Sequence, residues 1–142
     1  MDLTIKEAEI GDVKNLVELD QIASKEIKPW APQLFKEFKK SLQNPKFCFL
    51  IAYFNDKRAG YLESEYDRDK DFIWIKNIYV LKEFRKRGIS RKLVEKCVHK
   101  WKSKSNLFVL LTSDKNVKTF ERLKFKKTMN YMVYKGKSEN GL

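Results

Sequence analysis

An unbroken run of eight apolar residues, Phe47-Cys-Phe-Leu-Ile-Ala-Tyr-Phe54, limits the folds open to this chain more than any other feature. The run has the length of a strand, and it lacks the polar alternation of a strand with one face in water. Both of its faces must therefore be covered, which predicts a sheet placed between helices. The run is far too short to span a bilayer, which needs about 20 apolar residues.

Segments typical of strands and helices surround this run in a regular order. A short first strand at Leu3–Ile5 precedes a helix that begins at Asp12, and a second helix has Pro32 in its first turn. After the apolar run we expect two strands, a helix, a strand, a short helix and a last strand or strand pair, at 59–66, 72–80, 93–101, 107–111, 117–123 and 125–135.

The resulting order, β-α-α-β-β-β-α-β-α-β, predicts an α/β (α+β) fold. A hairpin meander followed by one βαβ crossover gives a mixed, mostly antiparallel sheet with helices on both faces. With 142 residues, the chain has the size of one domain. We therefore expect a single domain over 1–142, with a frayed polar tail at 136–142.

Positive charge is the strongest compositional signal. Thirty-one Lys and Arg residues against nineteen Asp and Glu residues give a formal net charge of +12. Such a charge favours anionic partners, such as nucleic acid, an anionic membrane or a phosphorylated cofactor. A single histidine, His99, excludes a histidine-rich metal centre, so we expect no metal. We expect Cys48 and Cys97 to be buried free thiols in a reducing cytoplasm, and we expect no signal peptide and no membrane partner.

The segment from Val80 to Ser90 joins a predicted buried strand to the start of an amphipathic helix. A helix N-terminus leaves about four backbone N–H groups unpaired and carries the positive end of the helix dipole. Gly88 has no Cβ, so the chain can turn sharply there and a ligand can approach the backbone. Positive side chains surround the same point, at Arg85, Lys86, Arg87, Arg91 and Lys92. These features indicate an anion site suited to a pyrophosphate, with a solvated basic turn as the alternative.

The spacing Arg85-x-x-Gly88-x-Ser90 resembles the Arg/Gln-x-x-Gly-x-Gly/Ala signature of the GNAT family of N-acetyltransferases. Phe120-Glu-Arg-Leu-Lys-Phe125 is similar to the family's helix end, Tyr-Glu-Lys-Leu-Gly-Phe. The resemblance implies that acetyl-CoA is the co-substrate and that a primary amine attacks its acetyl group directly. It also implies backbone contacts to the pyrophosphate from Arg87, Gly88, Ile89 and Ser90, contacts to the pantetheine arm from Ile78, Tyr79 and Val80, and a thioester near Asn116 and Phe120.

Three departures from the family pattern concern chemistry and capping. Phe120 stands where many members have the tyrosine that protonates the departing thiolate, and Tyr79, Tyr131 and Tyr134 are other possible donors. Lys76-Asn77 stands where some members carry a general-base glutamate. Lys124 replaces the glycine that ends the family's helix, which predicts a different cap.

An attacking amine of the lysine type has a pKa of about 10.4, so it must lose a proton before it reacts. Glu63 and Glu65 share one face of the strand beside the predicted catalytic strand, and they are the candidate bases. A solvated strand face is the alternative interpretation. Neither glutamate needs to act alone, because a bound water could relay the proton.

Five acids lie between Glu63 and Asp71 in a chain that is otherwise basic. We expect this hairpin, with Asp67 and Asp69, to attract a small cationic amine or a protein amine as the acceptor. The loop around Trp30 would form the other wall of the acceptor site. A polar hairpin turn without a binding role is the alternative.

Two other functions stay open from the sequence. A basic nucleic-acid-binding domain would explain the ten Lys and Arg residues between Lys82 and Lys104. Zinc-finger spacing, a glycine-rich RNA-binding signature and a helix-turn-helix pattern are missing from the sequence, which argues against that function. The second alternative is a GNAT-fold protein that binds acyl-CoA and catalyses weakly. A homodimer is a further hypothesis, since a short last strand would leave a sheet edge open.

Overall fold

The computed structural model describes residues 2–27, 31–129, 132 and 134. The elements are β1 (Leu3–Glu7), the short 3-10 helix η1 (Ile10–Asp12), α1 (Val13–Glu26), α2 (Phe35–Leu42), β2 (Phe47–Phe54), β3 (Lys57–Asp67), β4 (Phe72–Val80), η2 (Lys82–Phe84), α3 (Ile89–Trp101), β5 (Phe108–Leu110), η3 (Asp114–Asn116) and α4 (Val117–Arg122). The chain forms two compact units, 1–110 and 111–142. The expectation of one domain over 1–142 stays a prediction.

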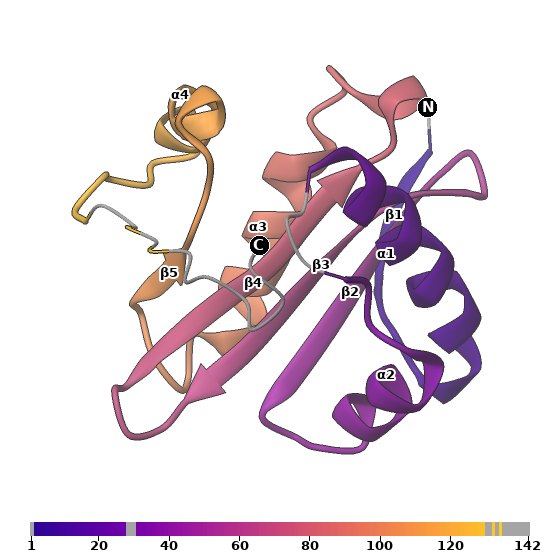
Figure 1. Cartoon of the computed structure of the whole chain (residues 1–142), viewed down its shortest axis with the longest axis horizontal. Helices are drawn as coiled ribbons and strands as arrows, with labels where there is room; N and C mark the ends of the chain where they lie inside the picture. Colours follow the sequence, from indigo (N-terminus) through magenta and orange to yellow (C-terminus); the bar gives the residue numbers. More distant parts are fainter. Residues whose placement is uncertain (1, 28–30, 130–131, 133, 135–142) are drawn as a thin grey trace, which may run out of the picture. The chain divides into compact units, whose positions relative to one another are not determined.

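The first unit contains a five-stranded sheet in the order β1-β2-β3-β4-β5 (Figure 1). The pairings from β1 to β4 are antiparallel, and β5 pairs with β4 in parallel after the crossover through α3. This arrangement confirms the predicted fold class, a mixed and mostly antiparallel sheet. The strand order follows the chain order, so β4 lies between the antiparallel meander and its parallel neighbour.

Helices cover both faces of the central strands, as the apolar run predicted (Figure 1). On one face, α1 and α2 join a buried cluster that includes Leu16, Leu19, Phe38, Phe49, Ile51 and Tyr61. On the other face lies α3, where the indole Nε1–H of Trp101 donates to Ser64 Oγ over 2.9 Å. Successive residues of a strand point to opposite faces. Glu63 therefore faces the layer of α1 and α2, whereas Ser64 faces α3.

Two predicted boundaries differ from the structure. The second helix begins at Phe35 rather than near Pro32. The N–H of Gln33 donates to Asp20 Oδ2 on α1 (2.8 Å), and the N–H of Leu34 donates to Glu37 Oε1 (3.1 Å), so the chain enters the helix from an extended conformation. Within the predicted last strand, 125–129, 132 and 134 are described and none of them is in a strand.

Candidate functional site

The edge of β4 that faces β5 is only partly used by the sheet. The register of β4 with β5 runs from Ile73 to Ile75 and stops there, although β4 continues to Val80. Within the described residues, no strand pairs with 76–80 on that side. The last five residues of β4 therefore offer main-chain groups that an extended ligand could pair with.

A β-bulge determines which of these groups point outward. On β3, Glu63 and Ser64 are consecutive, but they face Asn77 and Ile75 of β4, so Lys76 is an additional residue. Beyond the bulge, the N–H of Leu81, directly after β4, donates to the Ala59 carbonyl of β3 (2.8 Å). Strand residues alternate, so the main-chain groups of Ile78 and Val80 point to the open edge.

The N-terminus of α3 follows a few residues after this edge. Gly88 precedes the helix with a φ of 76°, in the left-handed region that favours glycine. The first helical bond runs from Lys92 N–H to the Gly88 carbonyl (3.1 Å), so the N–H groups of Ile89, Ser90 and Arg91 have no acceptor within the helix. A Cβ at Gly88 would meet no other atom within 4 Å, so the space beside this backbone is open. The turn and the helix end therefore present unpaired main-chain donors of the kind that binds anions in other proteins, and the predicted pyrophosphate site stays a prediction.

The basic side chains near this helix end are of two kinds: some are exposed, and one folds back onto the protein. Lys86, Arg87 and Arg91 are exposed. The guanidinium of Arg87 lies 4.9 Å from the ring centre of Phe54. Arg85 instead folds back onto the protein, because its Nε–H donates to the Val80 carbonyl (2.9 Å). The positive field at the predicted pyrophosphate site therefore comes from side chains and from the helix dipole together.

Glu26, the last residue of α1, links Arg85 to the sheet. One Nη–H of Arg85 donates to Glu26 Oε2 over 2.9 Å, and the hydroxyl of Tyr79 donates to the same oxygen. The bond from Arg85, then that from Tyr79, holds the pKa of Glu26 below its ordinary value. Burial, followed by the bond to Glu26, raises the pKa of Tyr79 to about 12. Tyr79 thus stays protonated at neutral pH and is a weak acid.

Glu63 lies on the opposite side of β4 from the open edge, in the layer of α1 and α2. Its side chain is almost completely buried, with the residue 3% exposed. The amide groups of Asn77 (2.6 Å) and Gln33 (2.9 Å) both donate to Glu63 Oε1. Asn77 adjoins the bulge, so the carboxylate is held close to the point where β4 and β5 part.

A second buried carboxylate, Asp20 of α1, fixes the segment that carries Gln33. Asp20 accepts from the Gln33 N–H and, over 2.6 Å, from the hydroxyl of Tyr61. Burial raises the pKa of Tyr61, so its hydroxyl stays a donor. Asp20, Gln33 and Glu26 were not among the residues expected at the site from the sequence. An acid between Leu19 and Ala23, on the apolar face of the helix, was the available signal for Asp20.

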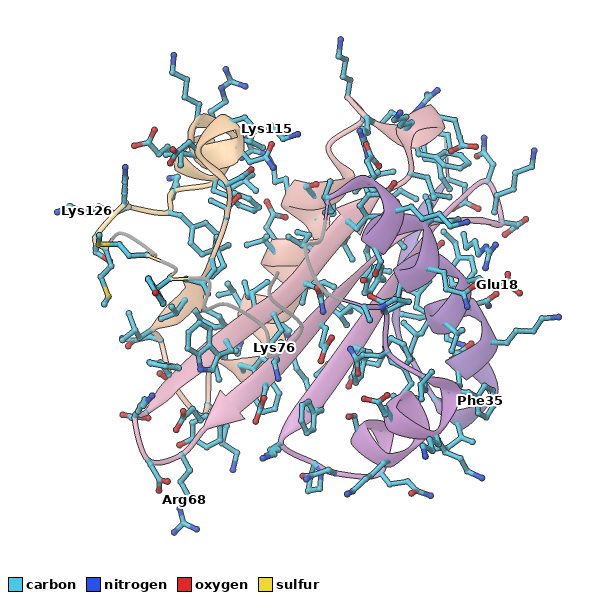
Figure 2. All side chains as sticks on the ribbon, in the orientation of Figure 1. Glu18, Phe35, Arg68, Lys76, Lys115 and Lys126 are labelled. Atoms are coloured by element: carbon cyan, nitrogen blue, oxygen red, sulfur yellow. The ribbon has the colours of Figure 1, made fainter. Side chains whose placement is uncertain are left out.

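Glu65, the other candidate base, is engaged by two lysines. Its carboxylate forms ion pairs with Lys76 (2.9 Å) and Lys46 (3.2 Å). Figure 2 places Lys76 on the long central strands and Arg68 at the tip of the β3–β4 hairpin. Near that tip, Asp67 Oδ1 accepts the N–H of Lys70 (3.0 Å), and Asp69 is exposed. Trp30 and Tyr131 lie outside the described residues.

The second unit contains Asn116 and Phe120. Asn116 precedes α4 and donates its side-chain amide to Ser113 Oγ over 3.3 Å. The ring of Phe120 packs edge-on against Phe125, with 5.9 Å between ring centres. Lys124 adopts a φ of 74°, and the N–H groups of Lys124 and Phe125 donate to Glu121 and Phe120. This is a Schellman cap, so the expected different cap is wrong: lysine adopts the left-handed conformation where the family has glycine.

Three further findings concern metals, membranes and thiols. The described residues contain no group of three or more His, Cys, Asp or Glu side chains that could hold a metal ion. None of the helices in that part of the chain is long and apolar enough to cross a membrane. Cys48 and Cys97 are buried and free, as predicted. Burial raises the pKa of Cys97 to about 11, so this thiol is unreactive at neutral pH.

The comparisons with known proteins agree with the resemblance seen in the sequence. Residues 14–125 match the acetyltransferase (GNAT) family. The search of curated proteins found no match. Many solved structures share the fold.

Three of these structures illustrate the similarity. AAC(6')-Iy in complex with the bisubstrate analog CoA-S-monomethyl-acetylneamine is 18% identical, with 97% of this chain and 100% of that chain covered and a TM-score of 0.78. A predicted acetyltransferase from Clostridium acetobutylicum with acetyl-CoA is 16% identical, with coverages of 94% and 96% and a TM-score of 0.77. The aminoglycoside acetyltransferase meta-AAC0020 from an uncultured soil metagenomic sample, in complex with sisomicin, is 15% identical, with coverages of 95% and 97% and a TM-score of 0.76.

Proposed function

The chain belongs to the GNAT acetyltransferase family, and from this premise we propose that it transfers the acetyl group of acetyl-CoA to a primary amine. Acetyl-CoA supplies an activated thioester. The amine nitrogen forms a bond to the acetyl carbon, the bond from that carbon to sulfur breaks, and the electron pair leaves with the CoA thiolate. The products are an N-acetylated amine and CoA.

One observation carries the donor half of this proposal. The open edge of β4, at Ile78 and Val80, is joined to the N-terminus of α3 by residues 81–88, which end at the left-handed Gly88. An extended arm with amide groups can pair with a strand edge, and a diphosphate fits the unpaired N–H groups of a helix N-terminus. Acetyl-CoA combines both chemical features in one molecule. Two solved neighbours carry acetyl-CoA or a CoA-based analog, which supports the same assignment.

Glu63 is the better candidate for the base that deprotonates the amine. Gln33 and Asn77 hold its carboxylate in one orientation beside the bulge. A base must be positioned before its proton affinity matters, and buried amide donors provide that position. The oxygens of Glu65 are already engaged by two ammonium groups. We therefore assign the proton transfer to Glu63 and a structural role to Glu65.

For the acceptor we propose a small amine with several positive charges. Two of the similar structures are complexes with sisomicin and with an acetylneamine conjugate of CoA. In this chain Asp67 ends β3 and Asp69 lies in the turn between β3 and β4, and from the sequence we expect Trp30 to form another wall of the site. A cationic amine suits this group of acids despite the overall positive charge. A protein amine with basic neighbours is the second acceptor class to test.

The direct test is turnover with a panel of amines. The protein is incubated with acetyl-CoA and, separately, with neamine, spermidine and a lysine-containing peptide. Release of free thiol is followed, and the products are identified by mass spectrometry. We expect thiol release that requires an amine and one acetyl group on the product. Acetyl-CoA binding without amine-dependent release would favour an acyl-CoA-binding protein, and salt-dependent DNA binding without CoA affinity would favour the nucleic-acid alternative.

The free thiols of Cys48 and Cys97 support a reducing compartment such as the cytoplasm. Fractionation of the native source is the measurement for this location. A homodimer stays a prediction, and sedimentation of the purified chain tests it.

A further inference from the structure

Arg85 opens the signature Arg85-x-x-Gly88-x-Ser90, yet its side chain folds back against the ends of β4 and α1. Its Nε–H donates to the Val80 carbonyl, and its Nη–H forms a charged hydrogen bond with Glu26, both over 2.9 Å. The guanidinium also lies 5.4 Å from the ring centre of Tyr79. These contacts use the planar fork of the guanidinium, which lysine could not reproduce.

The partners of Arg85 come from two different elements. Tyr79 and Val80 end β4 and lie at the end of its open edge. Glu26 ends α1, the helix whose Asp20 accepts the N–H of Gln33, and the side chain of Gln33 in turn donates to Glu63. One side chain thus connects the turn before α3 to the helix that leads into the acceptor side.

The link between Arg85 and Glu26 is strengthened because the acceptor oxygen of Glu26 is shared with a second donor. Glu26 Oε2 receives both Arg85 and the hydroxyl of Tyr79, which is itself buried. The Glu26 and Arg85 side chains are 25% and 40% exposed. An isolated pair at such exposure contributes little, but a charged bond joined to a buried phenol and to a main-chain carbonyl fixes the geometry of all three groups.

We propose that Arg85 is a positioning residue: through Glu26 it holds the turn 85–88 against the end of α1 and so couples the donor site to the acceptor side. The inference rests on the proposed acetyltransferase function. It differs from a direct role, in which the guanidinium of Arg85 would itself bind the pyrophosphate. Under the proposal, the backbone of the turn binds the anion, and the side chain keeps that backbone in place.

Removal of the Glu26 carboxylate distinguishes the positioning role from a direct phosphate contact, because the two roles predict different changes in the Kd for acetyl-CoA. Glu26→Ala leaves the charge of Arg85 intact and frees its guanidinium. A positioning role predicts that the Kd for acetyl-CoA rises roughly three- to tenfold, with Glu26→Gln between the wild type and Glu26→Ala. A direct phosphate contact predicts an unchanged or lower Kd, because the freed guanidinium could reach the ligand.

A matched control exists on the same helix. Glu18 of α1, labelled in Figure 2, forms an ion pair with Arg58 of β3, and their side chains are 38% and 29% exposed. Glu18→Ala therefore removes an ion pair of similar exposure that does not involve the turn before α3. We expect it to change the Kd by less than about twofold.

Amide hydrogen exchange of the free protein provides a readout that needs no ligand. The experiment compares the wild type with Glu26→Ala, Arg85→Met, the double variant and Glu18→Ala. We expect faster exchange over 82–90 in the first three variants but not in the control, with the double variant no faster than Arg85→Met. Unchanged exchange in Glu26→Ala, or a Kd that rises in Arg85→Met alone, would overturn the proposal. If the wild type did not bind acetyl-CoA, the proposed function would fail, and exchange would still decide whether Glu26 and Arg85 hold the turn.

Discussion

The proposed donor side and the proposed acceptor side of the candidate site consist of different kinds of chemical group. The donor side consists of main-chain groups, at the edge of β4 and at the first turn of α3. The acceptor side consists of side chains that come from distant parts of the chain, such as Gln33 and Glu63, thirty residues apart. A main-chain site tolerates many substitutions as long as its conformation is kept. A side-chain site depends on each residue and on the packing that holds it.

The largest effects are expected when a buried core side chain is truncated, in α2 for the acceptor side or in α3 for the donor side. Phe38 of α2 is fully buried and packs edge-on against Phe49, and Leu93 of α3 is fully buried on the other face. We expect Phe38→Ala to lower the free energy of unfolding by about 3–5 kcal/mol and Leu93→Ala by about 2–5 kcal/mol, in urea denaturation.

The two truncations should nevertheless differ in ligand binding. Measured by calorimetry at a temperature where both variants are folded, the Kd for acetyl-CoA should rise in Leu93→Ala and stay within about twofold in Phe38→Ala. The KM for the amine should show the reverse order. If Phe38→Ala weakened acetyl-CoA as much as Leu93→Ala does, the two sides would not be separate. Phe38→Leu offers a milder cavity should the alanine variant unfold.

Loss of the candidate base should reduce turnover more than any other change on the acceptor side. We expect Glu63→Gln to lower kcat/KM by about 100-fold at neutral pH, because the amine then reaches the thioester still protonated. The deficit should shrink as the pH approaches about 10, where the free amine becomes abundant. A full pH profile of kcat/KM checks both parts.

Glu65→Gln is the matched control for that prediction. It lies two residues away on the same strand face and loses ion pairs with Lys46 and Lys76. We expect less than about a fivefold loss, without a change in the shape of the pH profile. Equal losses in both variants, at every pH, would contradict the assignment of Glu63.

The difference between the two sides also explains what could be predicted from the sequence. The turn before α3 could be predicted because its Gly88 and its basic residues are contiguous. The fold could be predicted because long apolar strands and amphipathic helices fix the layers. The contact of Glu63 with Gln33 could not be predicted from the sequence, because it depends on how α1 ends and where the following helix begins. The roles of Asp20 and Glu26 could not be predicted for a related reason: their hydrogen-bond partners lie far away in the sequence.

The link through Glu26 should appear as a pH-dependent stability. Its pKa is lowered from an ordinary value of 4.5, so it stabilises the folded state above that pH and loses the effect as the pH falls through the lowered value. We expect Glu26→Ala to lower the free energy of unfolding by about 1 kcal/mol or less at pH 7. The gap to the wild type should close at pH values well below 4.5. Urea denaturation of both proteins at a series of pH values checks this prediction. A stability difference of the same size at every pH would contradict the ion pair.

The smallest effect is expected at Phe120. A thiol with a pKa near 8.5 leaves without much help, so Phe120→Tyr should change kcat by less than about twofold. Retained packing against Phe125 should leave the fold intact. A large gain in turnover would show that the chain has lost a proton donor that its chemistry requires.

The proposed function depends above all on the backbone around Gly88, which we propose binds the diphosphate of acetyl-CoA. Calorimetric titration of acetyl-CoA into the wild type, Gly88→Asn and Gly88→Asp tests it most directly. Asparagine and aspartate have nearly the same shape and both tolerate the left-handed conformation, so they differ mainly by one negative charge. We predict micromolar binding by the wild type, a modest loss in Gly88→Asn and a further loss of about tenfold or more in Gly88→Asp. Equal affinities for the two variants, or no binding by the wild type, would show that this backbone does not bind the diphosphate.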